Sequence, residues 1–353
     1  MSSWSDYIPQ VLKFEKRLGE DKKAVTAIDE YNKMYSHGSE SEQDRTLRES
    51  EKGKDMVSDF YNLVSDFYEW GWAQSFHFAV IQKGEPFEAS LQRYEYMLPY
   101  RLGVERGQHL IDLGCGIGGP LRNIARFARC KVTGVTISKY QVERGNELNK
   151  QLNLEDTCNI VHGDFLNLPF EDETFDGAYT IEATCHTMEK TKVYSEAYRV
   201  IKPGCCFAGY EWCVTDKYDP QNKEHREAKF AVEVGNGLPD TATFDQVIQS
   251  LKEAGFEVLE YYDASKYSEL PWYYPLKAGF SVKGFRHTRV GHYFTHITVT
   301  TLEKLGIVPK GSAEVSRMLV KAAQDLVRAG ELGIYIPMFF FLARKPEKPS
   351  TQS

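Results

Sequence analysis

A glycine-rich turn is the part of the sequence whose residue types and spacing most directly indicate chemistry. In the segment HLIDLGCGIGGP (109–120), an apolar run precedes Gly114, Gly116 and Gly118, and a helical pattern follows them. Glycine allows a tight strand-to-helix turn and lets a ligand approach the backbone amides closely. We therefore predict that this turn, including Cys115, binds a cofactor. Dinucleotide sites have a similar turn, so the glycines alone do not identify that cofactor.

Acidic side chains near the ends of β-rich runs help to distinguish the cofactors. Asp112 stands two positions before the first glycine, which resembles motif I of class I methyltransferases, where such an acid faces the methionine ammonium of S-adenosylmethionine. A dinucleotide site usually has a ribose-binding acid after the second strand, whereas this sequence has Thr136. Asp164 and Phe165 follow the third run, where an acid suits the adenine amine. Together these residues predict S-adenosylmethionine, although Asp112 and Asp164 taken singly could simply cap helices.

Thr136 also departs from the commonest class I pattern, which has an acid at this position for the ribose hydroxyls. Gln141, one helical turn later, could supply that contact, and we predict both residues at the cofactor site. Gln141 could equally be the last residue of a capping box that begins at Ser138. The sequence leaves both interpretations of Gln141 open.

The elements that must position these residues alternate regularly along the chain. β-rich runs separated by helical patterns indicate an α/β fold with a parallel sheet of βαβ units. Thr243 and Gln246 form a capping-box pattern, and Gly255 marks the end of that helix before another strand. The β-rich runs are 109–116, 131–138, 158–165, 175–183, 205–214 and a last strand at 334–345; the helical patterns between them are 118–129, 139–152 and 189–201.

We predict a class I methyltransferase fold, a Rossmann-like sheet with helices on both faces, extended at both ends. The gap 266–333 is too long for a bare loop, so it is interpreted as a helical insertion before the last strand. Aromatic residues are frequent in 268–294, which suits either a long flat apolar ligand and a membrane surface or an ordinary packed cap. The predicted division is an N-terminal helical and solvated extension 1–55, a methyltransferase core 56–265, a C-terminal region 266–345 and a tail 346–353.

Ionisable side chains lie among aromatic residues in three segments, the third of which contains Glu211 between Tyr210 and Trp212. Glu69 and His77 fall in FYEWGWAQSFHF (67–78), where six of twelve residues are aromatic. Glu182 and His186 follow the fourth β-rich run, at the sheet edge where open α/β folds bind ligands. If a helical turn begins there, these two side chains share one side and can hydrogen-bond. A purely local structural pair is the alternative.

Three of these strings, together with the glycine-rich segment, resemble a known family. The segments 67–78, 111–120, YTIEATCH (179–186) and YEWCVTDKYDP (210–220) resemble the four signature regions of sterol 24-C-methyltransferases, in the same order and at similar spacing. The resemblance extends from about 56 to 345. It implies that the insertion is a sterol-binding segment and that the partner is a sterol substrate.

The resemblance also implies a reaction and roles for the aromatic residues. Methylation of an alkene carbon leaves a tertiary carbocation, which is stabilised by aromatic faces and by the exclusion of water, and one base then removes a proton. It implicates Tyr68, Glu69, His77, Asp112 and Glu182 in binding or catalysis, and Glu196 as a further possibility that could instead be a salt-bridge residue. His186 is a catalytic candidate because of its position beside Glu182. Core packing remains the alternative for each aromatic residue. The predicted substrate-binding residues are Trp70, Trp72, Phe76, Phe78, Tyr179, Tyr210, Glu211 and Trp212.

Two other functions remain open at this point. A methyltransferase acting on a tocopherol, a phospho-base or an unsaturated acyl chain would share the glycine-rich turn. A lipid-binding module without catalysis would share the fold, although the retained Asp112 and Asp164 speak against it.

Composition excludes several further classes. A net charge of −7 over 353 residues argues against a nucleic-acid partner. Seven cysteines without C-x-x-C pairs argue against disulfides and zinc, and no secretory signal is visible. The longest apolar run, 334–343, is about half the ~20 residues that a transmembrane helix needs. We expect a cytoplasmic protein; the resemblance adds a homo-oligomer with peripheral contact to endoplasmic reticulum or lipid droplets.

Overall fold

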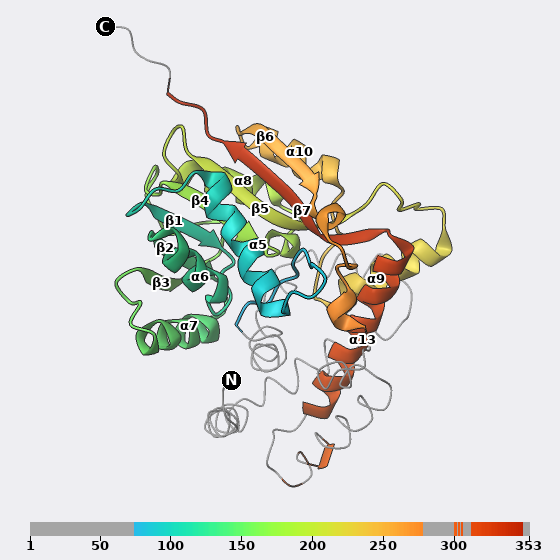
Figure 1. Ribbon diagram of the computed structural model, residues 1–353. Helices are drawn as coiled ribbons and strands as arrows, with labels where there is room; N and C mark the ends of the chain where they lie inside the picture. The colour runs from blue at the N-terminus through green and yellow to red at the C-terminus, as the bar shows by residue number, and fades with distance from the viewer. Residues whose placement is uncertain (1–73, 278–299, 302, 304, 306–311, 349–353) are drawn as a thin grey trace, which may run out of the picture. The chain divides into compact units, whose positions relative to one another are not determined.

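The computed structural model describes residues 74–277, 300, 301, 303, 305 and 312–348 (Figure 1). The chain divides into two compact units. The sheet unit comprises Tyr68–Asp219, Pro239–Trp272 and Gly333–Ser353, and it contains the β-strands described below. The described part of the helical unit includes the helices α9 (Lys223–Gly235) and α13 (Ser312–Leu332).

Within the described residues, the sheet has seven strands in the order β3-β2-β1-β4-β5-β7-β6 (Figure 1). The strands β1 to β5 are parallel to their neighbours. The strands are β1 (His109–Leu113), β2 (Lys131–Thr136), β3 (Cys158–His162), β4 (Gly177–Ile181), β5 (Cys206–Val214), β6 (Glu257–Asp263) and β7 (Tyr335–Arg344). The helices of this unit are α5 (Phe87–Leu102), α6 (Gly119–Ala128), α7 (Lys139–Gln151), α8 (Lys190–Val200) and α10 (Phe244–Glu253), with short 3₁₀ turns η1 (Thr184–His186) and η2 (Ala264–Tyr267).

The predicted α/β alternation is confirmed, with each strand and helix predicted between 109 and 263, and the last strand, present within a few residues of its expected bounds. The predicted N-terminal extension 1–55 and most of the aromatic segment 268–294 lie outside the described residues. The predicted capping box also forms, because the Thr243 hydroxyl accepts from the Gln246 amide at 3.2 Å and Gln246 Oε1 accepts from the Thr243 amide at 2.8 Å. Local side-chain chemistry therefore determines where α10 begins.

The last strand departs from the parallel arrangement of the βαβ units. β7 lies between β5 and β6 and is antiparallel to both. The chain reaches the sheet at Gly333, which has a φ of +70°, and the next residue, Ile334, accepts from the Thr215 amide at 2.9 Å beside the carboxyl end of β5. A strand that enters at that edge can only run back toward the amino ends of its neighbours.

Helices α5 and α8 cover opposite faces of β5. On one face, Tyr94 of α5 stacks on Tyr210, with ring centroids 3.7 Å apart. On the other face, Tyr194 of α8 packs against Phe207 and Phe341, and all three residues are fully buried. The apolar core therefore lies on both sides of the central strands, as expected for a sheet covered by helices on both faces.

Within the predicted insertion, residues 312–332 form the helix α13, whereas residues 266–277 form turns and short 3₁₀ segments. α13 packs closely against α9, so closely that a Cβ added at Gly235 would lie 2.9 Å from the Ala322 Cβ. Arg328 of α13 also forms ion pairs with Glu224 and Glu227 of α9. Residues 220–238 thus group with the insertion rather than with the core to which the sequence analysis assigned them. In the part of the chain that the structure describes, no helix has the length and apolar character needed to cross a bilayer.

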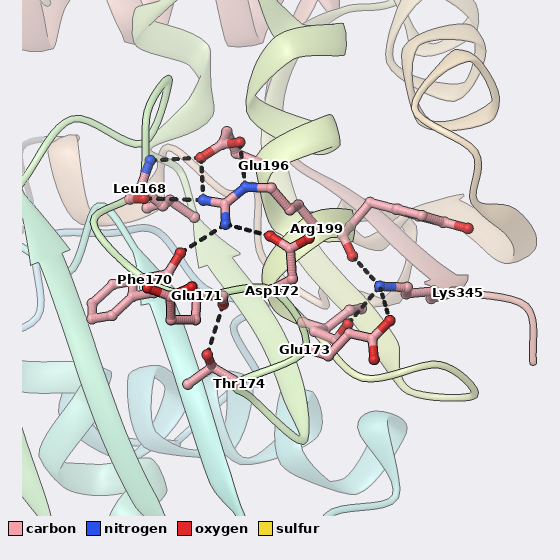
Figure 2. A network of polar contacts seen from close by, with 11 residues as sticks. Leu168, Phe170, Glu171, Asp172, Glu173, Thr174, Glu196, Arg199 and Lys345 are labelled. Carbon is pink, nitrogen blue, oxygen red and sulfur yellow. Dashed lines mark hydrogen bonds and ion pairs between the residues drawn. The ribbon is translucent and has the colours of Figure 1, made fainter. Parts of the chain in front are cut away.

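Glu196 is a structural residue, as the alternative interpretation of its helical position held. Its carboxylate accepts two hydrogen bonds of 2.8 Å from Arg199 and one of 2.7 Å from the Leu168 amide (Figure 2). Arg199 also donates to the carbonyls of Leu168 and Phe170 and to Asp172. This network attaches the segment before β4 to helix α8. Within this network the Glu196 carboxylate points toward Arg199 and the Leu168 amide.

We expect Glu196→Gln to lower the free energy of unfolding by about 1 kcal/mol, because one charge-assisted contact with Arg199 is lost at a partly exposed site. Methyl transfer at saturating cofactor should be unchanged. Urea denaturation and turnover measured on the same sample test this. A variant of unaltered stability that had lost turnover would return Glu196 to the catalytic candidates.

Candidate active site

The glycine-rich turn connects β1 to α6 with a backbone that only glycine adopts without strain. Gly114 and Gly118 have φ values of +84° and +80°. A Cβ at Gly114 would lie 2.2 Å from the Ala183 Cβ, and one at Gly118 would lie 2.7 Å from Ile160 Cδ1. A Cβ at Gly116 would meet nothing closer than Phe76 at 4.0 Å. Gly114 and Gly118 therefore permit close packing, whereas Gly116 faces open space that a ligand can use.

That open space is a pocket at the carboxyl end of β1. The pocket brings the predicted cofactor residues together with two residues of the aromatic segment, although Phe76 and His77 are some 35 positions earlier in the chain. Ile181, which directly precedes Glu182, contributes from the end of β4. The lining residues are Gln74, Phe76, His77, Asp112, Gly114, Cys115, Gly116, Ile117, Pro120 and Ile181.

Asp112 is the dominant charge of this pocket. Its side chain is buried, and burial raises the pKa of its carboxyl to about 7. The nearby Tyr179 hydroxyl and His77 lower the pKa but do not cancel the effect of burial. Among the described residues, no lysine or arginine pairs with Asp112. A buried carboxylate without a cationic side chain is suited to a ligand cation, which is what the ammonium of S-adenosylmethionine would provide.

The structure shows half of the capping box that was the alternative for Gln141. Its backbone amide donates to the Ser138 hydroxyl at 3.1 Å, so Ser138 caps helix α7. Its side-chain oxygen accepts from the Thr136 hydroxyl at 2.6 Å. Thr136 and Gln141 are thus held together at the end of β2. Their contact with a ribose remains a prediction.

Asp164 and Phe165 follow β3, as the sequence indicated. Asp164 Oδ1 accepts from the Leu166 amide at 2.8 Å, which closes a local turn. Both residues are partly exposed. Their contact with the adenine likewise remains a prediction.

Glu182 lies at the end of β4 in a strained conformation. Its φ is +53°, which costs a non-glycine residue on the order of 1 kcal/mol, and its amide donates to the Tyr210 carbonyl at 2.8 Å. The carboxylate accepts from the Phe78 amide at 2.8 Å and from Trp212 Nε1 at 2.7 Å. Burial raises the pKa of Glu182 to about 7, against the lowering effects of His77 and these donors.

The expected pairing of Glu182 with His186 is replaced by these contacts. A 3₁₀ turn, Thr184–His186, follows Glu182 in place of the first turn of a helix. His186 lies in that turn, partly exposed, and its amide donates to the Ala183 carbonyl at 3.2 Å. The i, i+4 spacing that motivated the pairing therefore does not apply.

Glu211 lies on the opposite face of β5 from its neighbours Tyr210 and Trp212, because successive side chains of a strand alternate. Its carboxylate accepts from the Thr184 hydroxyl, from Lys190 at 3.3 Å and from the Trp212 amide at 3.0 Å. That last bond satisfies an N–H at the irregularity between Glu211 and Cys213, where the register with β7 shifts. The structure thus shows Glu211 supporting Trp212, and its predicted contact with substrate stays a prediction.

The predicted aromatic faces occupy different surroundings. Phe76 lines the pocket, while Phe78 lies next to Trp212 and Trp272, with centroids 5.9 and 5.1 Å away. Tyr210 stacks on Tyr94 and donates to its carbonyl at 3.1 Å. Tyr179 is completely buried beside Asp112. Trp212 is therefore the predicted ring that directly contacts the Glu182 carboxylate, and the Phe78 ring packs next to it.

Four predicted residues, Tyr68, Glu69, Trp70 and Trp72, lie outside the described residues. One residue that the sequence analysis missed is Glu95 of helix α5, which is fully buried and pairs with His77 at 3.1 Å. A usable signal exists, because Glu95 interrupts the apolar helix positions Leu91, Tyr94 and Leu98. A carboxylate on such a stripe must have a partner in the interior.

Comparisons with known proteins agree with this geometry. A family model described as a methyltransferase domain matches residues 111–208, and one described as sterol methyltransferase C-terminal matches residues 282–347. The fold is similar to that of the cyclopropane synthase MmaA2 from Mycobacterium tuberculosis, with a TM-score of 0.64 at 16% identity over 83% of this chain and 98% of that chain. The predicted class I methyltransferase fold is thereby confirmed.

Closely related sequences identify the family. The chain is 46% identical over 324 residues to a cycloartenol-C-24-methyltransferase of Arabidopsis thaliana, covering 92% of this chain and 95% of that protein. It is 44% identical over 322 residues to a sterol 24-C-methyltransferase of Saccharomyces cerevisiae, covering 89% of this chain and 84% of that protein. The chain therefore belongs to the family of sterol 24-C-methyltransferases.

Proposed function

We propose that this protein transfers a methyl group from S-adenosylmethionine to C24 of a sterol side chain, in sterol biosynthesis. The observation that carries the proposal is the pair of buried carboxylates, Asp112 and Glu182, at the ends of the adjacent strands β1 and β4. Asp112 lines the same pocket as the glycine-rich turn, and Glu182 accepts a hydrogen bond from the ring of Trp212, which packs beside Phe78. Membership of the family supports the same acceptor.

S-adenosylmethionine supplies the electrophilic methyl group. Asp112 would bind its ammonium group, and the backbone from Gly114 to Gly118 would lie against the rest of the amino-acid part. Thr136 and Gln141 would hold the ribose, and Asp164 with Phe165 would hold the adenine. The cofactor would thus lie along the carboxyl ends of β1, β2 and β3, where open α/β sheets bind ligands.

The acceptor chemistry accounts for the aromatic surroundings of Glu182. The C24–C25 π electrons would form the new bond to the methyl carbon as its bond to the cofactor sulfur breaks and that electron pair stays on sulfur, which leaves a cation at C25. A hydride moves from C24 to C25, and a proton then leaves the new methyl group while its C–H electrons form a double bond to C24. Phe78 and Trp212 would stabilise the cation through their π faces, and Glu182 would accept the proton.

The proposed sterol substrate also indicates where in the cell the protein would act. Because sterols reside in membranes, the protein would contact the surface of the endoplasmic reticulum or of lipid droplets without spanning it, as a homo-oligomer. The preference among sterols follows from the acceptor pocket, to which the aromatic residues before β1 would contribute.

We expect label from [methyl-¹⁴C]S-adenosylmethionine to enter the sterol fraction when the protein is incubated with a Δ24 sterol. The matched saturated sterol serves as the control, because without the π bond there is no nucleophile. Parallel incubations contain a tocopherol precursor, phosphoethanolamine and an unsaturated phospholipid. Label in one of these lipids, with none in the Δ24 sterol, would replace the proposed acceptor.

The affinity for S-adenosylmethionine should depend on pH through Asp112. The ionised carboxylate binds the ammonium, and its pKa in the free protein is about 7. As the pH falls below 7, binding must displace a proton, so Kd should rise by up to about tenfold per pH unit. Isothermal titration between about pH 5.5 and 8 measures this dependence.

Two variants test whether Asp112 is the group that causes this pH dependence. Asp112→Asn should bind weakly at every pH and with little pH dependence. Glu182→Gln should retain the wild-type dependence. A wild-type Kd that stays constant across the range would exclude Asp112 as the binding group for the cation.

Glu182→Gln should retain cofactor binding and lose turnover by a factor of about 10²–10⁴, because the amide cannot accept the proton. Trp212→Phe is the matched variant, since it keeps an aromatic face but removes the hydrogen bond that lowers the pKa of Glu182. Its turnover should therefore rise with pH at a higher midpoint than the wild-type value near 7. Full turnover in Glu182→Gln would remove Glu182 from the reaction.

A further inference from the structure

His77 and Glu95 form a buried pair beside the pocket, of which His77 is a lining residue. Both side chains are almost completely buried. Glu95 Oε1 accepts from the Ser75 hydroxyl at 2.6 Å and contacts His77 Nε2 at 3.1 Å, while Oε2 accepts from the Asn123 amide at 2.7 Å. Two neutral donors converge on this carboxylate, an arrangement suited to an anion.

The positions of the His77 protons follow from its partners. Nδ1 lies 2.6 Å from the Phe78 carbonyl oxygen, which can only accept, so Nδ1 carries a proton. Nε2 faces a carboxylate oxygen that already accepts from Ser75, so Nε2 must carry a proton as well. Both ring nitrogens then act as donors, which is the hydrogen-bonding state of an imidazolium.

We propose that Glu95 is a positioning residue that keeps His77 as an imidazolium, so that His77 cannot accept the final proton and Glu182 remains the base. The part of this inference that concerns the base rests on the proposed function. The ionisation of His77 does not. His77 lines the pocket. Both of its ring nitrogens carry protons, which they donate to Glu95 and to the Phe78 carbonyl, so neither nitrogen can accept another proton.

The charges around His77 agree with this state. Burial lowers the pKa of His77, but the hydrogen bond and charge of Glu95, the charge of Glu182 and the Phe78 carbonyl together raise it above its ordinary value. Asp112, across the pocket, also interacts favourably with the imidazolium. The ion pair with Glu95 is neutral as a whole, so the pocket keeps the negative charge of Asp112 for the cofactor.

The arrangement also connects the two halves of the site through one short segment. His77 is fixed by Glu95, and the next residue, Phe78, donates its amide to Glu182 and accepts from His77 through its carbonyl. A fixed His77 therefore holds the backbone that orients the base.

The decisive measurement is a ¹H–¹⁵N long-range correlation spectrum of the full chain labelled with ¹⁵N-histidine, with His77 assigned from a His77→Asn sample. We expect both wild-type His77 nitrogens to have imidazolium shifts at about pH 7.5, well above the ordinary midpoint near 6.5. A neutral His77 at that pH would overturn the proposal. This test needs no variant at position 95.

Glu95→Gln and Ser75→Ala form a matched pair. Glu95→Gln removes the charge, so burial should lower the midpoint of His77 and leave it neutral, with the proton on Nδ1, at about pH 7.5. Ser75→Ala removes one hydrogen bond from the same carboxylate and should leave the imidazolium intact. If His77 stays charged in Glu95→Gln, or is neutral in Ser75→Ala, the assigned role of Glu95 is wrong.

Kinetics on the same samples separate this proposal from the proposed function. In Glu95→Gln, kcat should fall while the Kd for S-adenosylmethionine stays close to wild type, and the rise of turnover with pH should move to a higher midpoint, because a neutral His77 no longer lowers the pKa of Glu182. A midpoint that moves to lower pH instead would show that His77 is the base. A wild-type protein that binds no cofactor would contradict the proposed function and leave the ionisation of His77 unaffected.

Discussion

Burial of carboxylates at the carboxyl edge of the sheet is the constraint on which the rest of this structure depends. An ionised carboxyl group is costly inside a protein unless donors or a cation compensate it. Asp112, Glu182 and Glu95 meet this cost differently: with space for a ligand cation, with two N–H donors beside aromatic rings, and with a histidine. The same carboxyl group is therefore suited to a different task in each place: binding a cation at Asp112, accepting a proton at Glu182 and pairing with a histidine at Glu95.

The surrounding elements are arranged to hold these groups in place. The glycine at position 114 lets the turn after β1 approach Ala183, which directly follows Glu182. The strained backbone of Glu182 is supported by β5, and the irregularity in β5 at Trp212 is supported by Glu211 from the far face of the sheet. Residues that never face the pocket thus determine the direction of those that do.

Much of this protein is readable from its sequence. The periodicity of the strands and helices, the capping boxes and the glycine-rich turn are local signals, and local signals depend on neighbours within a few residues. The cofactor, the fold class and the family followed from such signals, since Asp112 and the glycines are contiguous in the chain. The antiparallel β7 did not, because the direction of a strand depends on the edge at which the chain enters the sheet.

The tertiary structure alone decided how the ionisable residues pair. Spacing along the chain suggested Glu182 with His186, but the partners of Glu182 are 104 and 30 positions away. Glu211 and Trp212 are adjacent in sequence and lie on opposite faces of one strand, while the partner of Glu95 was established only when α5 packed beside His77. Sequence pattern thus determined which side chains had to be buried. Packing determined what each one met there, because desolvation acts on whatever the fold brings into contact.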